Sequence, residues 1–141
     1  MYEIRIVKTK PMVVSEDGTK VTKPEDVFEM LKPIRDHNQE HFIAITLNGA
    51  GAVIQSRVIT VGLLNHSLVH PRETFRGAIL DNAASIIIAH NHPSGQLEPS
   101  SNDIAITQQM KESGAIIGIQ VIDHIIVGKE GYLSFRERGL I

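Results

Sequence analysis

An apolar run that ends in two histidines constrains this chain more than any other part of its sequence. Residues 85–89 read Ser-Ile-Ile-Ile-Ala, and His90 and His92 follow directly. Three consecutive isoleucines suit a strand that is covered on both faces, so we expect this strand inside a sheet rather than at its edge. Side chains two positions apart on a strand point the same way. The two imidazoles should therefore face one site.

A third candidate ligand follows the histidines. Asp103 lies in the first turn of an expected helix at about 101–113, which Ser100 caps and Gly114 ends. Imidazole and carboxylate groups bind zinc, and three protein ligands leave the fourth position for water, as in catalytic zinc sites. Ser100 and Asp103 also fit a capping box, which would explain both residues without a metal. The two interpretations are compatible, because the helix dipole favours an ionised Asp103 near the strand end.

Composition indicates a globular domain and limits which metal ligands the chain can supply. The chain has 141 residues, of which 42% are hydrophobic and 21% charged, typical of one globular domain. It has no cysteine, so zinc would have to be held by histidine and carboxylate groups. The net charge of −2 and the absence of tryptophan give no support to nucleic-acid binding. With no signal peptide and no apolar run of about 18 residues, we expect a cytoplasmic protein without a membrane span.

Hydrophobic periodicity predicts an α/β domain with a mixed sheet flanked by helices. One helix begins at Pro24 and is limited by Pro33, and a second runs from Pro71 to about Asn82 with Phe75, Ala78 and Ile79 facing inward. A hairpin turn is expected at 48–51 and a shorter hairpin at 12–18. The expected strands are 2–7, 42–47, 52–60, 85–89, 117–122, 124–128 and 132–135.

Several motifs resemble one known family. One motif reads His-x-His, then seven residues, then Ser-x-x-Asp, and it is similar to the JAMM motif of JAB/MPN metallohydrolases. The sequence segments that flank it resemble the RadC branch. The resemblance covers roughly residues 36–141 and is dense from His70 onward. The matching segments are 69–73, 90–95, 99–100, 103–107, 123–128 and 134–139.

The resemblance implies a fold, a cofactor and an activity. The fold would be the three-layer, cytidine-deaminase-like arrangement of JAB/MPN domains, spanning residues 1–141. Residues 1–35 would form a divergent N-terminal extension, unlike the helix-hairpin-helix region of full-length RadC proteins. His90, His92 and Asp103 would hold Zn²⁺, and Ser100 would orient the attacking water and stabilise the oxyanion. The implied activity is zinc-dependent hydrolysis of peptide, isopeptide or related amide bonds in a peptide or protein substrate.

The general base is a choice between two glutamates. Hydrolysis needs a carboxylate that takes a proton from water and returns it to the leaving group. In the family this glutamate begins an early core strand, and Glu40, directly before the expected strand 42–47, matches that pattern. Glu73, in the first turn of the helix from Pro71, is the alternative, although helix-dipole complementation also explains it. We favour Glu40.

The sequence also allows two other functions, and it suggests roles for three residues near the candidate ligands. The chain could be a nucleic-acid-processing or binding protein associated with DNA repair, or a regulatory MPN module with a vestigial site. Asp123 and His124 fit a pair that supports metal ligands from behind, or equally a buried structural pair. Asn91 should point away from the two histidines and serve structure, since neighbouring strand residues face opposite sides.

Overall fold

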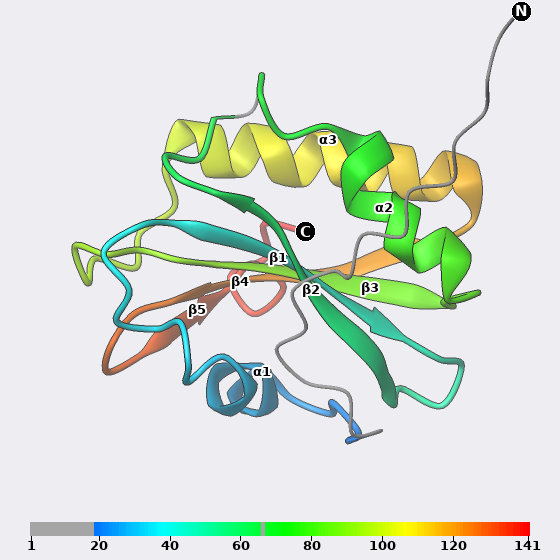
Figure 1. Cartoon of the computed structure of the whole chain (residues 1–141), viewed down its shortest axis with the longest axis horizontal. Coiled ribbons are helices and arrows are strands. Elements are labelled where there is room, and N and C mark those ends of the chain that lie inside the picture. The colour runs from blue at the N-terminus through cyan, green and yellow to red at the C-terminus, as the bar shows by residue number, and fades with distance from the viewer. Residues whose placement is uncertain (1–18, 66) are drawn as a thin grey trace, which may run out of the picture.

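A five-stranded mixed sheet forms the middle layer of the fold (Figure 1). The computed structural model describes residues 19–65 and 67–141. The strand order is β2-β1-β3-β4-β5, with β3 and β4 parallel and the other neighbours antiparallel. The strands are β1 (His41–Leu47), β2 (Val53–Val61), β3 (Ser85–Asn91), β4 (Gln120–Val127) and β5 (Tyr132–Ser134). The helices are α1 (Pro24–Met30), α2 (Pro71–Leu80) and α3 (Ser101–Ile117).

The predicted α/β class and the interior position of the histidine strand are confirmed. β3 is the central strand, bonded to β1 on one side and to β4 on the other. From Ile86 to Asn91 every residue is buried, as expected for a strand covered on both faces. The site at the end of β3 therefore rests on the most enclosed part of the sheet.

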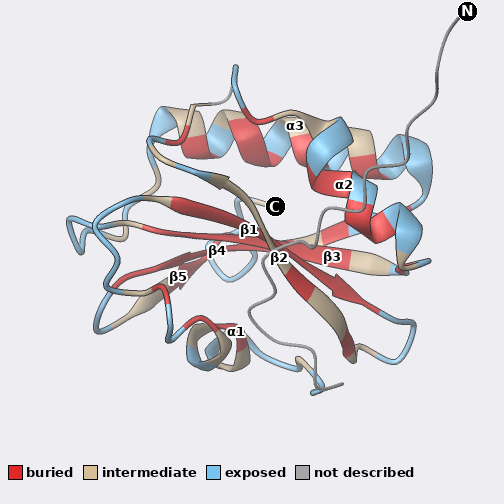
Figure 2. Ribbon diagram, viewed as in Figure 1, coloured by how far each residue is buried: buried red, intermediate tan, exposed pale blue. Residues whose placement is uncertain are grey.

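Helices cover both faces of the sheet, with α1 on one face and α2 and α3 on the other (Figures 1 and 2). The period-two alternation of strand side chains divides the apolar residues accordingly. On the α2 and α3 face, the shared core includes Phe42, Phe75, Ile86, Ile88, Ile106 and Met110. On the α1 face, it includes Val27, Leu31, Ile43, Ile45, Ile87 and Ala89.

The hairpin between β1 and β2 forms where the sequence predicts it. β1 and β2 pair antiparallel, and the turn joining them spans the expected residues. The side-chain oxygen of Asn48 accepts hydrogen bonds from the amides of Ala50 and Ala52, at 2.9 and 3.0 Å. Asparagine stabilises turns in this way because its side chain imitates a backbone carbonyl.

Gly114 does not end α3, contrary to the sequence prediction. The helix continues to Ile117 and ends at Gly118, whose φ of 78° lies in the left-handed region that glycine adopts readily. Gly114 instead marks a close contact with the returning chain. A methyl group there would lie 2.3 Å from the carbonyl oxygen of Ile119 and 3.2 Å from the Phe75 ring.

We expect Gly114→Ala to destabilise the fold by about 1–3 kcal/mol, because an added methyl in a filled space forces the backbone to shift. The matched control is Gly49→Ala, since a methyl group at Gly49 meets nothing within 4 Å. Urea denaturation followed by circular dichroism measures both variants. Equal free energies of unfolding in the two variants would show that α3 and the Ile119 carbonyl separate without cost.

Two further element predictions are corrected. The segment predicted as strands 117–122 and 124–128 is one strand, β4, whose pairing with β3 is irregular between Ile86 and Ile87. In the sequence, the polar pair Asp123 and His124 suggests a break between two strands. In the structure, both side chains are buried and have hydrogen-bond partners, so the strand continues through them.

The inward face of α2 also differs from the prediction. Phe75 and Ala78 are buried as expected, but Ile79 is 57% exposed. The buried face turns instead toward Thr74 and Gly77, where the absence of a side chain lets Arg57 lie against the helix. The strand predicted at 2–7 and the hairpin at 12–18 lie outside the described residues.

Candidate metal centre

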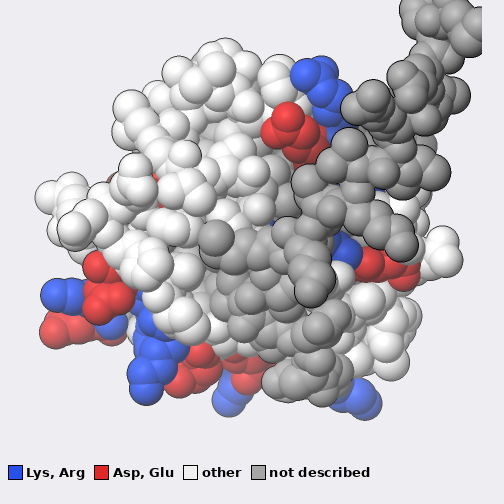
Figure 3. All heavy atoms as spheres, in the orientation of Figure 1, with Lys and Arg blue, Asp and Glu red and all other residues white. Residues whose placement is uncertain are grey.

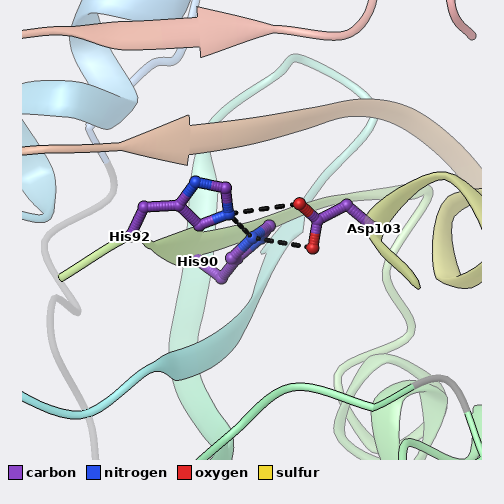
Figure 4. A group of neighbouring side chains, drawn as sticks. All are labelled: His90, His92 and Asp103. Carbon is purple, nitrogen blue, oxygen red and sulfur yellow. Dashed lines mark hydrogen bonds and ion pairs between the residues drawn. The ribbon is translucent and has the colours of Figure 1, made fainter. Parts of the chain in front are cut away.

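The two histidines and the aspartate converge at one end of the sheet (Figure 4). Nε2 of His90 lies 2.8 Å from Nε2 of His92 and 3.2 Å from Oδ1 of Asp103. Nε2 of His92 lies 3.1 Å from Oδ2 of the same carboxylate. The structure thus brings together the three residues that the sequence singled out as ligands.

The start of α3 fixes the position of the aspartate. Ser100 is the N-cap, and its hydroxyl accepts the Asp103 amide at 3.0 Å. Oδ2 of Asp103 accepts the Ser100 amide at 2.8 Å, which completes a capping box. The carboxylate therefore both caps the helix and faces the histidines, so the two interpretations of this motif hold together.

The electrostatic environment keeps the aspartate ionised. Burial opposes ionisation of Asp103, but the imidazoles of His90 and His92 and the Ser100 amide together hold the pKa of this carboxyl well below its usual range. Burial also opposes protonation of His92, but the contacts with Asp103 and with the Gln96 carbonyl, 2.6 Å from Nδ1, raise the pKa of His92. The ionised carboxylate of Asp103 therefore places a negative charge beside the two imidazoles.

Asn91 faces away from the ligands and holds the segment that leads into β1. Its side-chain oxygen accepts the His41 amide at 2.6 Å, and its amide nitrogen donates to the carbonyls of Gln39 and His37. The residue is fully buried. The predicted structural role of Asn91 is confirmed, and the segment that it holds contains Glu40.

Glu40 lines the same cleft as the candidate ligands. The cleft has a volume of about 620 Å³, and His92, Ser100 and Asp103 line it as well. Oε2 of Glu40 accepts the Leu64 amide at 2.7 Å, which anchors one carboxylate oxygen. The negative charge of Glu40 contributes to the raised pKa of His92, after burial and the contacts with Asp103 and Gln96.

Glu73 lies elsewhere. It is exposed on α2 and lines a separate hollow with Arg57 and Arg76. The structure therefore places Glu40, and not Glu73, beside the candidate ligands. Which of them acts as a base stays a prediction that kinetics must test.

The side chains of the polar pair on β4 have different partners, although Oδ1 of Asp123 also accepts the His124 backbone amide at 2.7 Å. Both oxygens of Asp123 are engaged by the C-terminal segment, through the Ser134 hydroxyl and the Arg136 amide. The imidazole of His124 points the other way, with Nε2 2.8 Å from Nδ1 of His90. Thr107 on α3 contacts the other ring nitrogen of His124. Sequence reasoning missed Thr107 as part of this site, although its position one helical turn after Asp103 was a usable signal.

The donor set fits a zinc ion. Zinc binds imidazole nitrogen and carboxylate oxygen, and here one such atom from each of the three residues lies within 4.8 Å of the others. His90 is fully buried and Asp103 nearly so, while His92 is partly exposed toward the cleft. The three side chains could therefore hold a metal ion at the edge of the cleft that His92 and Asp103 line.

Comparison with known proteins decides the family. A family model described as the RadC-like JAB domain matches residues 21–140. The chain belongs to the RadC-like JAB domain family. The sequence resemblance is thereby confirmed, and the match includes the candidate ligands, Ser100 and Glu40.

Curated relatives of this RadC-like JAB domain are similar over most of its length. A UPF0758 protein of Methanospirillum hungatei is 50% identical over 128 residues, which are 89% of this chain and 57% of the relative. A UPF0758 protein of Rubrobacter xylanophilus is 48% identical over 86% of this chain and 53% of its own length. The chain spans about half the length of the curated relatives it matches.

Helices of the described residues do not reach the length and apolar character that a membrane span requires. The longest of them, α3, has 17 residues.

Proposed function

We propose that this RadC-like JAB domain is a zinc-dependent hydrolase of peptide, isopeptide or related amide bonds. One observation carries the proposal: two imidazole nitrogens and a carboxylate converge beside a cleft that a further carboxylate, Glu40, also lines. That combination supplies ligands, an open side and a proton acceptor in one place. A regulatory module with a vestigial site would not require this combination of candidate ligands and a carboxylate beside one cleft.

The mechanism assigns a task to each residue. His90, His92 and Asp103 would hold the zinc ion, which when bound lowers the pKa of a water molecule and polarises the scissile carbonyl. Glu40 would accept the proton of the attacking water and return it to the leaving nitrogen. Ser100 sits at the cleft with a hydroxyl that already accepts the Asp103 amide, so its own proton is free to donate to the developing oxyanion.

The charges around the cleft favour a peptide over a nucleic acid. Glu40, Glu98 and Asp103 line the cleft, and among the described lining residues there is no lysine or arginine. Such a lining would repel a phosphate backbone, which nucleic-acid binding proteins meet with cations. On the face shown in Figure 3, the basic and acidic side chains of the described residues lie interspersed. Leu63, which lines the cleft and is 86% exposed, offers an apolar contact for a substrate side chain.

The test combines zinc content with cleavage. We expect the purified chain, after incubation with zinc and removal of excess metal, to carry about one zinc per chain, because the described residues contain one three-ligand cluster. The zinc-loaded chain should cleave members of a peptide and isopeptide library, and a chelator should abolish this cleavage until zinc is restored. Cleavage that survives complete zinc removal, or a loaded chain that cleaves nothing in the library, would contradict the proposal.

A further inference from the structure

A chain of buried hydrogen bonds runs behind the candidate metal centre. It joins Nδ1 of His90 to Nε2 of His124 at 2.8 Å, then Nδ1 of His124 to the hydroxyl of Thr107, and then that hydroxyl to the carbonyl of Asp103 at 2.7 Å. His90 and His124 are fully buried, and Thr107 is 3% exposed. This series of hydrogen bonds begins at His90 and ends at Asp103, which the proposed function uses as ligands. It connects β3, β4 and α3 behind the site.

The direction of this chain follows from its last link. A backbone carbonyl can only accept, so the single proton of the Thr107 hydroxyl goes to the carbonyl of Asp103. The Thr107 oxygen must then accept from His124, which places a proton on Nδ1 of that imidazole. A neutral imidazole with a proton on Nδ1 is an acceptor at Nε2. Nδ1 of His90 therefore carries the proton that this acceptor receives.

The surroundings of His124 hold it neutral and in place. Its ring stacks on Phe135 at a centroid distance of 4.5 Å and meets the ring of Phe42 edge-on. Its two ring nitrogens are engaged by His90 and Thr107. Neither ring nitrogen bonds to a carboxylate, and a charged imidazole buried between aromatic rings is costly.

We propose that His124, oriented by Thr107, is a positioning residue that fixes His90 with its proton on Nδ1, so that Nε2 presents its lone pair to the metal. The inference rests on the proposed function of His90 as a zinc ligand. His92 reaches the same state by a simpler route, because its Nδ1 donates to the Gln96 carbonyl. Both histidines thus present Nε2 to the site, one held by a backbone carbonyl and the other by the buried chain.

Inside the cluster, Nε2 of His90 faces two proposed ligand atoms. It lies 2.8 Å from Nε2 of His92 and 3.2 Å from Oδ1 of Asp103, so it points to the place that the metal would occupy. A metal bound there would leave the Nδ1 proton of His90 in its hydrogen bond to His124.

The first measurement uses the metal-free wild-type chain labelled with ¹⁵N. Long-range proton–nitrogen correlation spectra report which ring nitrogen of each histidine carries the proton, and His90→Gln and His124→Gln spectra assign the signals. We expect both His90 and His124 to be protonated at Nδ1. A His90 that is protonated at Nε2 alone would overturn the proposal, and this outcome does not depend on zinc binding or on any activity.

The second measurement removes the Thr107 hydroxyl, which orients His124 in the series of buried hydrogen bonds. Thr107→Val keeps the shape of the side chain and removes the hydroxyl, whereas Thr107→Ser keeps the hydroxyl and is the matched control. We expect zinc affinity, measured by competition with a chromophoric chelator, to fall about 10–100-fold in Thr107→Val, as for other residues that orient metal ligands. Thr107→Ser should restore most of the affinity.

The outcomes separate the two proposals. Equal zinc affinity in wild type and a folded Thr107→Val would overturn the role of the buried hydrogen bonds while leaving the zinc site intact. Wild type that shows the expected tautomers but binds no zinc would refute the proposed function alone. If Thr107→Val does not fold, the tautomers of the wild-type chain still decide the inference.

Discussion

His92→Ala should lower the zinc affinity of the chain by more than about 100-fold, because even residues that only orient metal ligands contribute about 10–100-fold. His92 is the ligand to choose for this test, since its imidazole is partly exposed and its loss leaves the sheet core intact. His90 and Asp103 are buried and engaged in the hydrogen bonds of the fold, so their alanine variants combine loss of a ligand with loss of stability.

The control for this experiment is His70→Ala. His70 precedes α2, and its side chain makes no capping hydrogen bond, so this variant removes an imidazole that the cluster does not contain. Competition with a chromophoric chelator gives the zinc affinity, and thermal unfolding of the metal-free chains shows that both variants fold. Full affinity in a folded His92→Ala chain would mean that zinc binds elsewhere.

The candidate metal cluster could be predicted from the sequence because its geometry depends on short segments of the chain. His90 and His92 share a face through strand alternation, and Asp103 returns to them through the helix that Ser100 caps. Each of these relations spans few residues and follows from the period of a strand or from the start of a helix. The same reasoning placed β3 inside the sheet, because three consecutive isoleucines need cover on both faces.

The features that sequence reasoning missed depend on contacts between distant segments. Gly114 has the appearance of a helix end, and only the position of Ile119 and Phe75 shows why a glycine is required there. His124 likewise looks like half of a pair with Asp123. Asp123 instead accepts from the Ser134 hydroxyl in the C-terminal segment, while the imidazole of His124 contacts His90 in the candidate metal centre.

The choice of general base needed both the sequence and the structure. Glu40 was favoured from the resemblance, and residue type and local pattern alone left Glu73 as an alternative. The structure brings Glu40 to the cleft because Asn91, on the face of β3 opposite the ligands, holds the segment before β1. A side chain on one face of a strand thus positions a carboxylate for the other.

Glu40→Gln should retain zinc and lose hydrolysis by about 10²–10⁴-fold, the usual contribution of a general acid–base group. The glutamine oxygen can still accept the Leu64 amide, as Oε2 of Glu40 does at 2.7 Å, so the side chain keeps its place and loses its basicity. The measurement is kcat on a substrate from the peptide library, together with zinc content and thermal stability. Loss of zinc along with activity would show that Glu40 acts on the metal site rather than on the proton.

The matched variant is Glu73→Gln, which makes the same chemical change on the exposed surface of α2, in a hollow separate from the cleft. We expect it to keep most of the activity, because its carboxylate lies outside the cleft in which the substrate would bind. An inactive Glu73→Gln beside an active Glu40→Gln would reverse the assignment of the base and leave the zinc ligands untouched. Because both variants remove one negative charge, a difference between them reports the position of the carboxylate and not the net charge of the chain.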